Sequence, residues 1–468
     1  MLKAVLKGIA FLPVVTIAGV VCAQSKGKNN AIYSGVPWFD KQGNIISAHG
    51  GGVIKDNNRF YFFGERHYDT SNAFAGFNCY SSNDLYTWQL EGAALPVQKS
   101  GKLGPDRVGE RPKVMKCEKT GEYILFMHAD TLGYKDQYVG YATAENITGP
   151  YTFKGPLLFN GQPIKKWDMG VFKDYDGAGY VLIHGGEIYK LSDDFKSIAE
   201  QVNKNMTSGF EAPVLFRKDS IYFFIGSHLS SWERNDNYYY TATALKGPWT
   251  KRGLLAPEGS LTWNSQATFV LPVTGTKDTS FIFMGDRWAY PKQASAATYV
   301  WQPLNVSGTG LSMPEYNAAW KIDATTGVAS SFAAAKEIIS MNDKRVIATA
   351  EWYKDSADYF SASKKNAAVT VKLKARQIGF LGLARPEGGY ALVSLTDSKG
   401  KKVLSAIVDM YCKYPVSTLK FMSPVLPVDS YTLTVTVMEE RGNWSDKRKA
   451  NYGSTGYVVS LDKIIVNE

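Results

Sequence analysis

Five polar side chains, well separated along the chain, each stand just ahead of a short apolar stretch that is expected to form a β-strand: His49, Glu110, Asp168, Glu211 and Gln266. If those strands begin around one centre, the five side chains share one pocket. Carboxylates gathered in a pocket suit glycosidic bond cleavage, in which a carboxylic acid protonates the leaving oxygen. The negative charge of a neighbouring carboxylate raises the pKa of that acid and keeps it protonated near neutral pH.

The sequence around Glu211 indicates how such a residue is placed. Residues 214–216 and 221–225 are apolar and aromatic, and the polar turn 217–220 between them is typical of a β-hairpin. Glu211 precedes this hairpin and is followed by Ala212 and Pro213. Because proline donates no ladder hydrogen bond and keeps the preceding residue extended, Glu211 is expected at the edge of a sheet. Alone, such a glutamate is more often a solvated turn residue, but the unit around it recurs.

The same apolar–turn–aromatic unit occurs five times. The copies lie at residues 52–63, 113–126, 170–183, 214–225 and 268–284, with further hairpins between them. A period of roughly 40 to 60 residues, with several strands in each repeat, is typical of a β-propeller. We therefore predict an all-β fold in which residues 30–325 form a five-bladed β-propeller. The alternative is a large β-sandwich whose hairpins are spaced by accident.

A second region follows the repeats. An alanine-rich bridge at residues 330–341 leads into short alternating stretches at 368–373, 390–395 and 431–437, separated by turn signals. This pattern is typical of an all-β sandwich, and we predict one at residues 341–468. Two functions are open for it: a carbohydrate-binding module, or a structural support for the propeller.

The composition favours a sugar partner over a nucleic acid. The chain has 468 residues, of which 13% are aromatic, and a formal net charge of +10. Aromatic side chains suit sugar stacking as well as strand cores. The basic residues form no sustained run and no nucleic-acid motif is present, so we expect a polysaccharide or oligosaccharide substrate and no nucleic acid. A monomer is expected.

The first residues have the pattern of a secretory signal peptide at 1–23. Lys3 and Lys7 precede an apolar run at residues 9–21, and residues 21–23 form an acceptable cleavage site. Export to the periplasm or the extracellular space is therefore expected, whereas cleavage ahead of Cys22 would give a lipid-anchored surface form. Three cysteines remain, without metal-type spacing, so a disulfide framework is not expected: Cys79, Cys117 and Cys412.

Short motifs around these positions resemble a known family. They are His49-Gly50-Gly51-Gly52, Gly64-Glu65-Arg66, Gly109-Glu110-Arg111-Pro112-Lys113, Trp167-Asp168-Met169, Glu211-Ala212-Pro213, Ser230-Ser231-Trp232, Ser265-Gln266-Ala267-Thr268, Met284-Gly285-Asp286-Arg287-Trp288 and Tyr299-Val300-Trp301. Together, over residues 36–323, they resemble glycoside hydrolase family 43, whose members are five-bladed and inverting. The resemblance is closer to its exo-β-1,3-galactanase branch. The motifs are specific in combination and weak singly.

The resemblance implies three catalytic residues. Glu211 would be the general acid, and Asp168 would adjust its pKa and orientation. The usual base of the family is an aspartate at the start of the first blade, where this chain has His49. The galactanase branch carries a glutamine at the position of Gln266, which would act as a base in its imidic-acid form or orient the attacking water. Glu211 and Gln266 are then expected to face each other across a bound galactose.

The other candidate residues would bind the terminal sugar. By the same resemblance, Glu110, Arg111 and Tyr134 would grip it and Glu65 would help to select the axial hydroxyl of galactose. Ser230, Trp232 and His49 complete the predicted set of substrate-binding residues. Ser230-Ser231 and Glu233-Arg234-Asn235 depart from the pattern of the branch at positions expected near the sugar. Fine specificity is therefore open.

We expect an exo-acting, inverting glycoside hydrolase that releases galactose from β-1,3-galactan, the backbone of arabinogalactan. Within the family the alternatives are α-L-arabinofuranosidase and β-D-galactofuranosidase. Because the usual base is missing, a non-catalytic galactan-binding protein is an alternative of another class. No ligand cluster is evident in the sequence, and no metal or cofactor is expected to take part in the chemistry.

Overall fold

The structure, a computed structural model, describes residues 28–204, 206–355, 359–446 and 449–467. Regular structure in these ranges is almost entirely β-strand, apart from two four-residue helices, α1 (Leu261–Asn264) and α2 (Gln293–Ala296). The predicted all-β class is confirmed. The predicted signal peptide and Cys22 lie outside the described residues. Within the described ranges, no helix is both long enough and apolar enough to cross a membrane.

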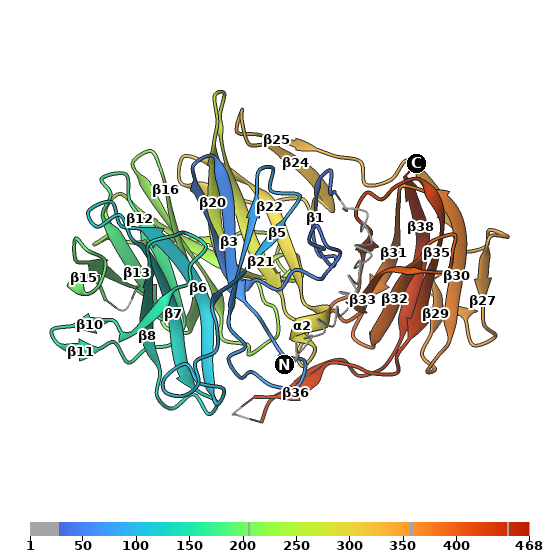
Figure 1. Ribbon diagram of the computed structural model, residues 1–468, viewed down its shortest axis with the longest axis horizontal. Coiled ribbons are helices and arrows are strands. Elements are labelled where there is room, and N and C mark those ends of the chain that lie inside the picture. Colours follow the sequence, from blue (N-terminus) through green and yellow to red (C-terminus); the bar gives the residue numbers. More distant parts are fainter. Residues whose placement is uncertain (1–27, 205, 356–358, 447–448, 468) are drawn as a thin grey trace, which may run out of the picture.

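Five mainly antiparallel sheets follow one another along the chain and make up the left part of Figure 1. The first three sheets consist of β2 (His49–Asp56), β3 (Arg59–Glu65), β4 (Phe77–Ser82) and β5 (Gln89–Leu95); β6 (Arg107–Lys116), β7 (Tyr123–Thr131), β8 (Tyr138–Ala144) and β9 (Thr152–Pro156); and β12 (Met169–Lys173), β13 (Gly179–Ile183), β14 (Glu187–Leu191) and β15 (Ile198–Asn203), extended by β10 (Leu158–Phe159) and β11 (Gln162–Pro163). The last two consist of β16 (Phe210–Lys218), β17 (Ile221–His228), β18 (Tyr238–Ala242) and β19 (Thr250–Leu254), and of β20 (Gln266–Thr274), β21 (Thr279–Arg287), β22 (Thr298–Ser307) and β23 (Gly310–Ser312).

The first strands of these sheets contact one another in a closed cycle. β2 contacts β6, β6 contacts β12, β12 contacts β16, β16 contacts β20, and β20 contacts β2. The five predicted hairpin units supply the first two strands of the five sheets. We call these five first strands, β2, β6, β12, β16 and β20, the inner strands. The cycle of contacts brings their starts around one centre.

Consecutive aromatic residues fill the spaces between neighbouring sheets. In β3, Phe62 packs into the cluster shared with the fifth sheet, whereas Phe63 packs into the cluster shared with the second. In β17, Phe223 and Phe224 likewise enter two different clusters. Successive side chains of a strand point to opposite faces, so an aromatic pair serves both interfaces of its sheet. Each buried phenylalanine contributes roughly 1.5–3 kcal/mol through removal of apolar surface from water.

Two further sheets pack face to face on the right of Figure 1. One contains β26 (Glu337–Ser340), β28 (Tyr353–Lys354), β29 (Phe360–Ala362), β31 (Gln377–Ala384), β34 (Val416–Met422) and β38 (Val459–Asn467), and the other β27 (Val346–Ala348), β30 (Ala368–Ala375), β32 (Tyr390–Thr396), β33 (Lys402–Asp409) and β35 (Asp429–Val437). β35 alternates buried and half-buried residues, as expected of a strand with one face on the core. A small sheet of β1 (Ile32–Tyr33), β24 (Ala319–Asp323) and β25 (Val328–Ser331) and the hairpin of β36 (Asn443–Ser445) and β37 (Asn451–Gly453) complete the fold.

The C-terminal sheets are packed firmly against the five N-terminal ones. The Tyr411 hydroxyl donates to Oε2 of Glu233 at 2.5 Å, and the Arg234 guanidinium lies 5.3 Å from the centre of the Tyr411 ring. Arg234 also donates to the carbonyl oxygen of Trp288 at 3.0 Å. Contrary to expectation, Glu233 and Arg234 do not face the substrate pocket. They are buried where the two regions meet, and their side chains contact Tyr411 and Trp288 there.

Candidate active site

Three of the inner strands, β2, β6 and β16, carry the same backbone irregularity, a β-bulge, beside their polar side chains. The pairing register of β2, β6 and β16 with the next strand shifts within the first residues of each strand. The residue after each polar side chain has a positive φ: Gly50 (59°), Arg111 (54°) and Ala212 (56°). A β-bulge of this kind bends the strand and re-aims the side chains beside it. The repeated bulge therefore sets the direction of the functional groups at these three strand starts.

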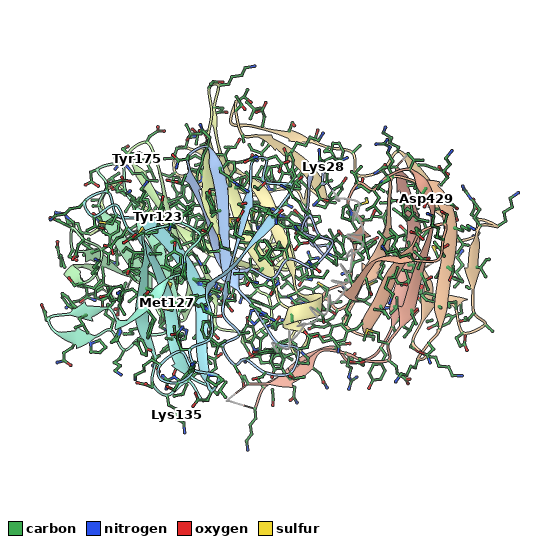
Figure 2. The ribbon with its side chains drawn as sticks, in the orientation of Figure 1. Lys28, Tyr123, Met127, Lys135, Tyr175 and Asp429 are labelled. Atoms are coloured by element: carbon green, nitrogen blue, oxygen red, sulfur yellow. The ribbon has the colours of Figure 1, made fainter. Side chains whose placement is uncertain are left out.

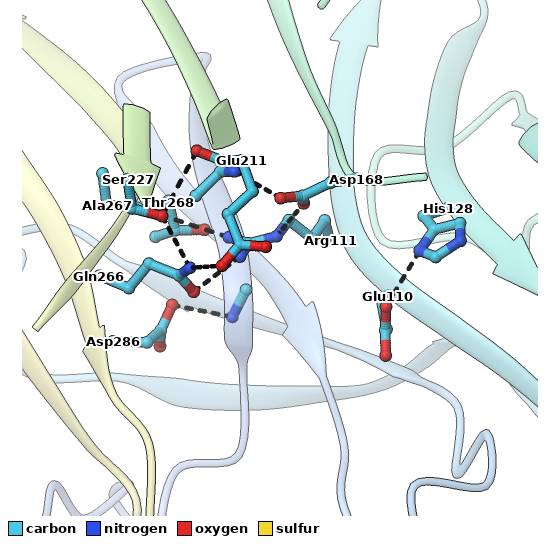
Figure 3. Close-up of polar contacts among 12 residues, drawn as sticks. Glu110, Arg111, His128, Asp168, Glu211, Ser227, Gln266, Ala267, Thr268 and Asp286 are labelled. Carbon is cyan, nitrogen blue, oxygen red and sulfur yellow. Dashed lines mark hydrogen bonds and ion pairs between the residues drawn. The ribbon is translucent and has the colours of Figure 1, made fainter. Parts of the chain in front are cut away.

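Four of the five polar residues at the strand starts line one pocket of about 540 Å³: Glu110, Asp168, Glu211 and Gln266 (Figure 3). This volume is typical of a small-molecule site. The complete lining consists of Asn72, Glu110, Arg111, His128, Asp130, Tyr134, Gln137, Trp167, Asp168, Glu211, Leu229, Ser231, Trp232, Gln266, Tyr290, Trp444, Ser445 and Asp446. The convergence predicted from the repeats is thus present for the carboxylates and the amide.

Glu211 has the properties of an acid that holds its proton. Burial, followed by the negative charge of Asp168, raises the pKa of Glu211 to about 8, against the opposing charge of Arg111. Asp168 in turn forms an ion pair with Nε of Arg111 and accepts the backbone N–H of Ala212, the residue next to the acid. The carboxylate of Asp168 therefore acts on Glu211 both through its charge and through the backbone.

The amide of Gln266 is fixed by four hydrogen bonds. Nη2 of Arg111 and Nε1 of Trp288 donate to Oε1 of Gln266 at 2.8 and 2.9 Å. Since guanidinium and indole N–H groups can only donate, this end of the amide is the oxygen. Nε2 of Gln266 donates to Oε1 of Glu211 at 3.0 Å and to Oγ of Ser227 at 2.9 Å. Both ends of the amide are therefore occupied by protein partners.

The direct contact between Glu211 and Gln266 differs from the expected arrangement, in which a galactose separates them. Their hydrogen bond of 3.0 Å leaves no space for a sugar between the two groups. Two largely buried polar groups on neighbouring strands satisfy each other in this way, because an unpaired buried donor or acceptor is costly. A sugar that binds between Glu211 and Gln266 must break this hydrogen bond and supply new hydrogen-bond partners to both side chains.

Glu110 lies between two hydrogen-bond donors, Tyr134 and His128. It accepts hydrogen bonds from the Tyr134 hydroxyl at 2.6 Å and from Nδ1 of His128 at 3.0 Å. Burial opposes the charge on Glu110, but the hydrogen bond and charge of His128 outweigh it and lower the pKa of Glu110. Burial likewise opposes the charge on His128, whose pKa rises to about 9 through Asp130 and Glu110. Glu110 is thus an ionised acceptor, in contrast to the protonated Glu211.

Two predicted sugar-binding residues lie beneath the pocket and do not line it. Glu65 accepts the backbone N–H of Arg111 at 2.8 Å and is 3.0 Å from Nε2 of His67. His49 is 1% exposed, and its Nδ1 is 3.0 Å from Oδ1 of Asp286. In this arrangement Glu65 supports the strand start that carries Arg111, and His49 is a packed core residue.

In the segment of residues 230–232, Ser231 lines the pocket in place of the predicted Ser230. Ser230 does not line the pocket; its hydroxyl donates to the carbonyl oxygen of Glu233 at 2.6 Å. Its neighbour Ser231 lines the pocket, with a φ of 55°, and so does the predicted Trp232. The Trp232 ring is parallel to that of Tyr290, with centroids 5.9 Å apart.

Sequence reasoning missed several residues of the lining. His128 and Asp130 could have been found from the hairpin register, because His128 pairs with Glu110 across β6 and β7. Trp167 precedes Asp168 and is 38% exposed. Trp444 and Asp446 belong to the C-terminal region, and no local signal connects them with the repeats.

Among the residues that the structure describes, no group of three or more His, Cys, Asp or Glu side chains could hold a metal ion.

Comparison with known structures gives relatives that share this architecture. An exo-β-1,3-galactanase from Phanerochaete chrysosporium, solved with galactose, is 28% identical, and the match covers 93% of this chain and all of that chain with a TM-score of 0.70. A variant of that protein was solved with β-1,3-galactotriose. A Bifidobacterium bifidum s17 protein assigned as an exo-β-1,3-galactanase is 36% identical over 60% of this chain and 95% of that chain, with a TM-score of 0.56.

Sequence comparison identifies the family. The model of glycosyl hydrolases family 43 matches residues 51–253. The extracellular endo-α-(1→5)-L-arabinanase 2 of Bacillus subtilis (strain 168) is 23% identical over an alignment of 337 residues, and the match covers 64% of this chain. The matched part spans 66% of the length of that relative, just under two thirds. This chain belongs to glycosyl hydrolase family 43 and is a glycoside hydrolase whose structural neighbours are exo-β-1,3-galactanases.

Proposed function

We propose that this glycoside hydrolase is exo-acting and inverting and that it releases galactose from β-1,3-galactan. The observation that carries the proposal is the direct pairing in the pocket of a buried carboxyl with a raised pKa, Glu211, with an amide, Gln266. The galactanase neighbours support the same substrate. We interpret the five cyclically arranged sheets, within residues 30–325, as the blades of a propeller, and residues 341–468 as a β-sandwich domain.

Glu211 acts as the general acid in this proposal. Its raised pKa keeps the proton on the carboxyl at neutral pH, where it can be given to the oxygen of the departing sugar. Water attacks the anomeric carbon from the opposite face, so the β linkage yields α-galactose. Asp168 remains beside the acid and holds its backbone through Ala212.

We infer that Gln266 orients the attacking water and does not take its proton. A base requires a free lone pair, but the amide oxygen already accepts from Arg111 and Trp288. The imidic-acid form would add a proton to that same oxygen, facing two obligate donors. Once a sugar displaces Glu211 from Nε2, the freed N–H can donate to a water molecule. The barrier is then lowered chiefly by the acid and by stabilisation of the oxocarbenium ion.

Glu110 and Arg111 are proposed to hold the terminal galactose. An ionised carboxylate accepts hydrogen bonds from sugar hydroxyls, and a guanidinium donates to them. Tyr134 and His128 fix Glu110 from two sides, so its orientation is set before the sugar arrives. Such pre-organisation lowers the entropy cost of binding.

Export is proposed as well, because the apolar leader fits it and the Bacillus subtilis relative is extracellular.

The product profile tests the proposal. The purified protein, incubated with β-1,3-galactan, should release galactose stepwise and pass β-1,6 side chains, and early proton NMR spectra should show the α-anomer first. Glu211→Gln is the control that should bind galactan and release none. Release of arabinose without galactose from arabinogalactan would favour an α-L-arabinofuranosidase, and release of galactofuranose a β-D-galactofuranosidase. Binding without release by the unchanged protein would identify a galactan-binding protein without activity.

A further inference from the structure

The hairpin of β36 and β37 extends from the C-terminal sheets to the mouth of the pocket. In Figure 1 it reaches beneath the five N-terminal sheets, away from the core of its own region. Trp444, Ser445 and Asp446 of this hairpin line the pocket together with residues of the N-terminal sheets. The substrate site is therefore built from both regions of the chain.

The base of the hairpin is held closely. A Cβ atom at Gly442 would stand 2.5 Å from the carbonyl oxygen of Tyr290 and 2.7 Å from the hydroxyl of Tyr390, so only glycine fits. The N–H of Ser454 donates to the carbonyl oxygen of Gly442 at 2.7 Å and closes the hairpin. Tyr390 donates to the carbonyl oxygen of Ala289 at 3.0 Å, next to the pocket residue Tyr290. The wall that the hairpin forms is thus fixed to the N-terminal sheets at its base.

Four rings form a row that we call the aromatic row: Trp232, Tyr290, Trp444 and Tyr452. Trp232 and Tyr290 are parallel, Tyr290 meets Trp444 edge-on at 5.9 Å, and Trp444 stacks on Tyr452 at 5.9 Å with 18° between the planes. Nε1 of Trp444 also donates to Oγ of Ser231 at 3.2 Å. All four rings are half-buried. The indole of Trp444 is thus oriented by contacts with both regions and remains partly accessible.

The aromatic row differs from the centre of the pocket in exposure and in chemistry. Arg111, Asp168 and Gln266 are 8%, 7% and 6% exposed, and the charged groups of the site gather there. The hairpin wall is more accessible and offers flat rings beside the polar groups of Ser445 and Asp446. Pyranose rings present C–H groups on one face, which pack against aromatic faces, while their hydroxyls require polar partners. The wall therefore suits a sugar that lies outside the catalytic centre.

We propose that the β36–β37 hairpin, chiefly through Trp444, binds the galactosyl residues on the leaving-group side of the cleaved bond. This inference rests on the proposed function, since it takes β-1,3-galactan as the substrate and the charged centre as the site of the terminal galactose. The C-terminal region then acts neither as a separate binding module nor as a support alone. It supplies one wall of the catalytic pocket.

Trp444→Ala in the full-length protein tests the proposal. The KM for β-1,3-galactotetraose should rise about tenfold, as expected for the loss of one stacked ring. The inhibition constant of free galactose, which occupies only the terminal position, should stay within about twofold. Trp444→Phe keeps a flat ring and should restore most of the affinity. Tyr353→Ala removes an exposed aromatic residue of the same region that does not line the pocket, and should leave both constants unchanged.

Thermal melting separates a binding effect from a folding effect. If Trp444→Ala melts early, Trp444→Leu replaces it, because leucine retains apolar bulk without a flat face. An unchanged KM in a folded variant, or a parallel rise in the inhibition constant of galactose, would overturn the inference while the proposed function stands. Failure of the unchanged protein to release galactose from β-1,3-galactan would instead overturn the proposed function and, with it, this inference.

Discussion

Two cavities lie at opposite ends of the same inner strands, and they differ in what lines them. The larger, of about 930 Å³, is lined by the far ends of β2, β6, β12, β16 and β20, whereas the pocket of about 540 Å³ lies at the starts of these strands. Figure 2 shows the separation. Tyr175, which lines the larger cavity, lies at the upper edge, and Lys135, next in sequence to the pocket residue Tyr134, lies at the lower edge.

The charges in the two cavities are solvated differently. At the larger cavity Lys116 and Asp56 are 3.3 Å apart with side chains 34% and 14% exposed, and neighbouring turns carry further charges of both signs. In the pocket, the paired side chains of Arg111 and Asp168 are 10% and 9% exposed. Water screens the first pair more than the second. Burial and convergence of charges, and not the volume of the cavity, therefore favour the smaller pocket as the candidate active site.

The largest effect is expected from Glu211→Gln, which keeps the shape of the side chain and removes its proton. The kcat on β-1,3-galactan should fall about a thousandfold or more, because protonation of the leaving oxygen is lost. Binding of galactan should persist. Steady-state rates together with calorimetric titration of the variant measure the two quantities. Substantial turnover by this variant would show that the acid lies elsewhere.

Gln266→Ala should have the next largest effect. It removes the proposed donor to the attacking water and leaves two N–H groups, of Arg111 and Trp288, without their acceptor. The kcat should fall about a hundredfold or more, as for the loss of one oriented polar group in a catalytic centre. Gln266→Glu is the matched variant: a gain in rate relative to alanine would favour a base at this position. Near-normal turnover of the alanine variant would exclude any role for the amide.

Asp168→Asn should change the pH dependence of the reaction. The acid works only while protonated, so kcat/KM of the unchanged enzyme should fall above the raised pKa of Glu211, about 8. The substitution removes the negative charge that raises this pKa and frees Arg111 to lower it further. The alkaline limb should therefore move to lower pH by about one unit, with about fivefold loss of rate at pH 8 and about tenfold loss well above it. An unmoved limb would show that Asp168 does not adjust the acid.

The repeated unit made much of the pocket predictable. Each hairpin unit places one polar residue at a strand start, and a closed cycle of strands brings these starts together. Glu110, Asp168, Glu211 and Gln266 follow from this rule, as does the all-β class. The same rule misplaced His49, because its side chain turns to Asp286 in the core. A repeat position fixes where a backbone begins, but local packing decides where its side chain points.

Contacts between the two regions could not be predicted from local sequence. Trp444 lies far along the chain from the repeats, and only the packing of the C-terminal sheets brings its hairpin to the pocket. The positions of Glu233 and Arg234 could not be predicted for the same reason. Their sequence neighbours line the pocket, but these two side chains contact Tyr411 where the two regions meet. Glu211 and Gln266 are predictable as pocket residues, but their direct hydrogen bond depends on side-chain rotamers that the sequence pattern does not specify.

The smallest effect is expected at the far end of β6, the strand that carries Glu110 and Arg111 at its start. Lys116→Met removes the charge that pairs with Asp56 while keeping an unbranched side chain. Because this pair is screened by water and far from the reacting bond, kcat/KM on β-1,3-galactan should stay within about twofold. Steady-state kinetics at low and moderate salt measure the change. A large loss of kcat/KM would mean that the larger cavity takes part in turnover. Burial of charge would then not be the property that distinguishes the active site from the larger cavity.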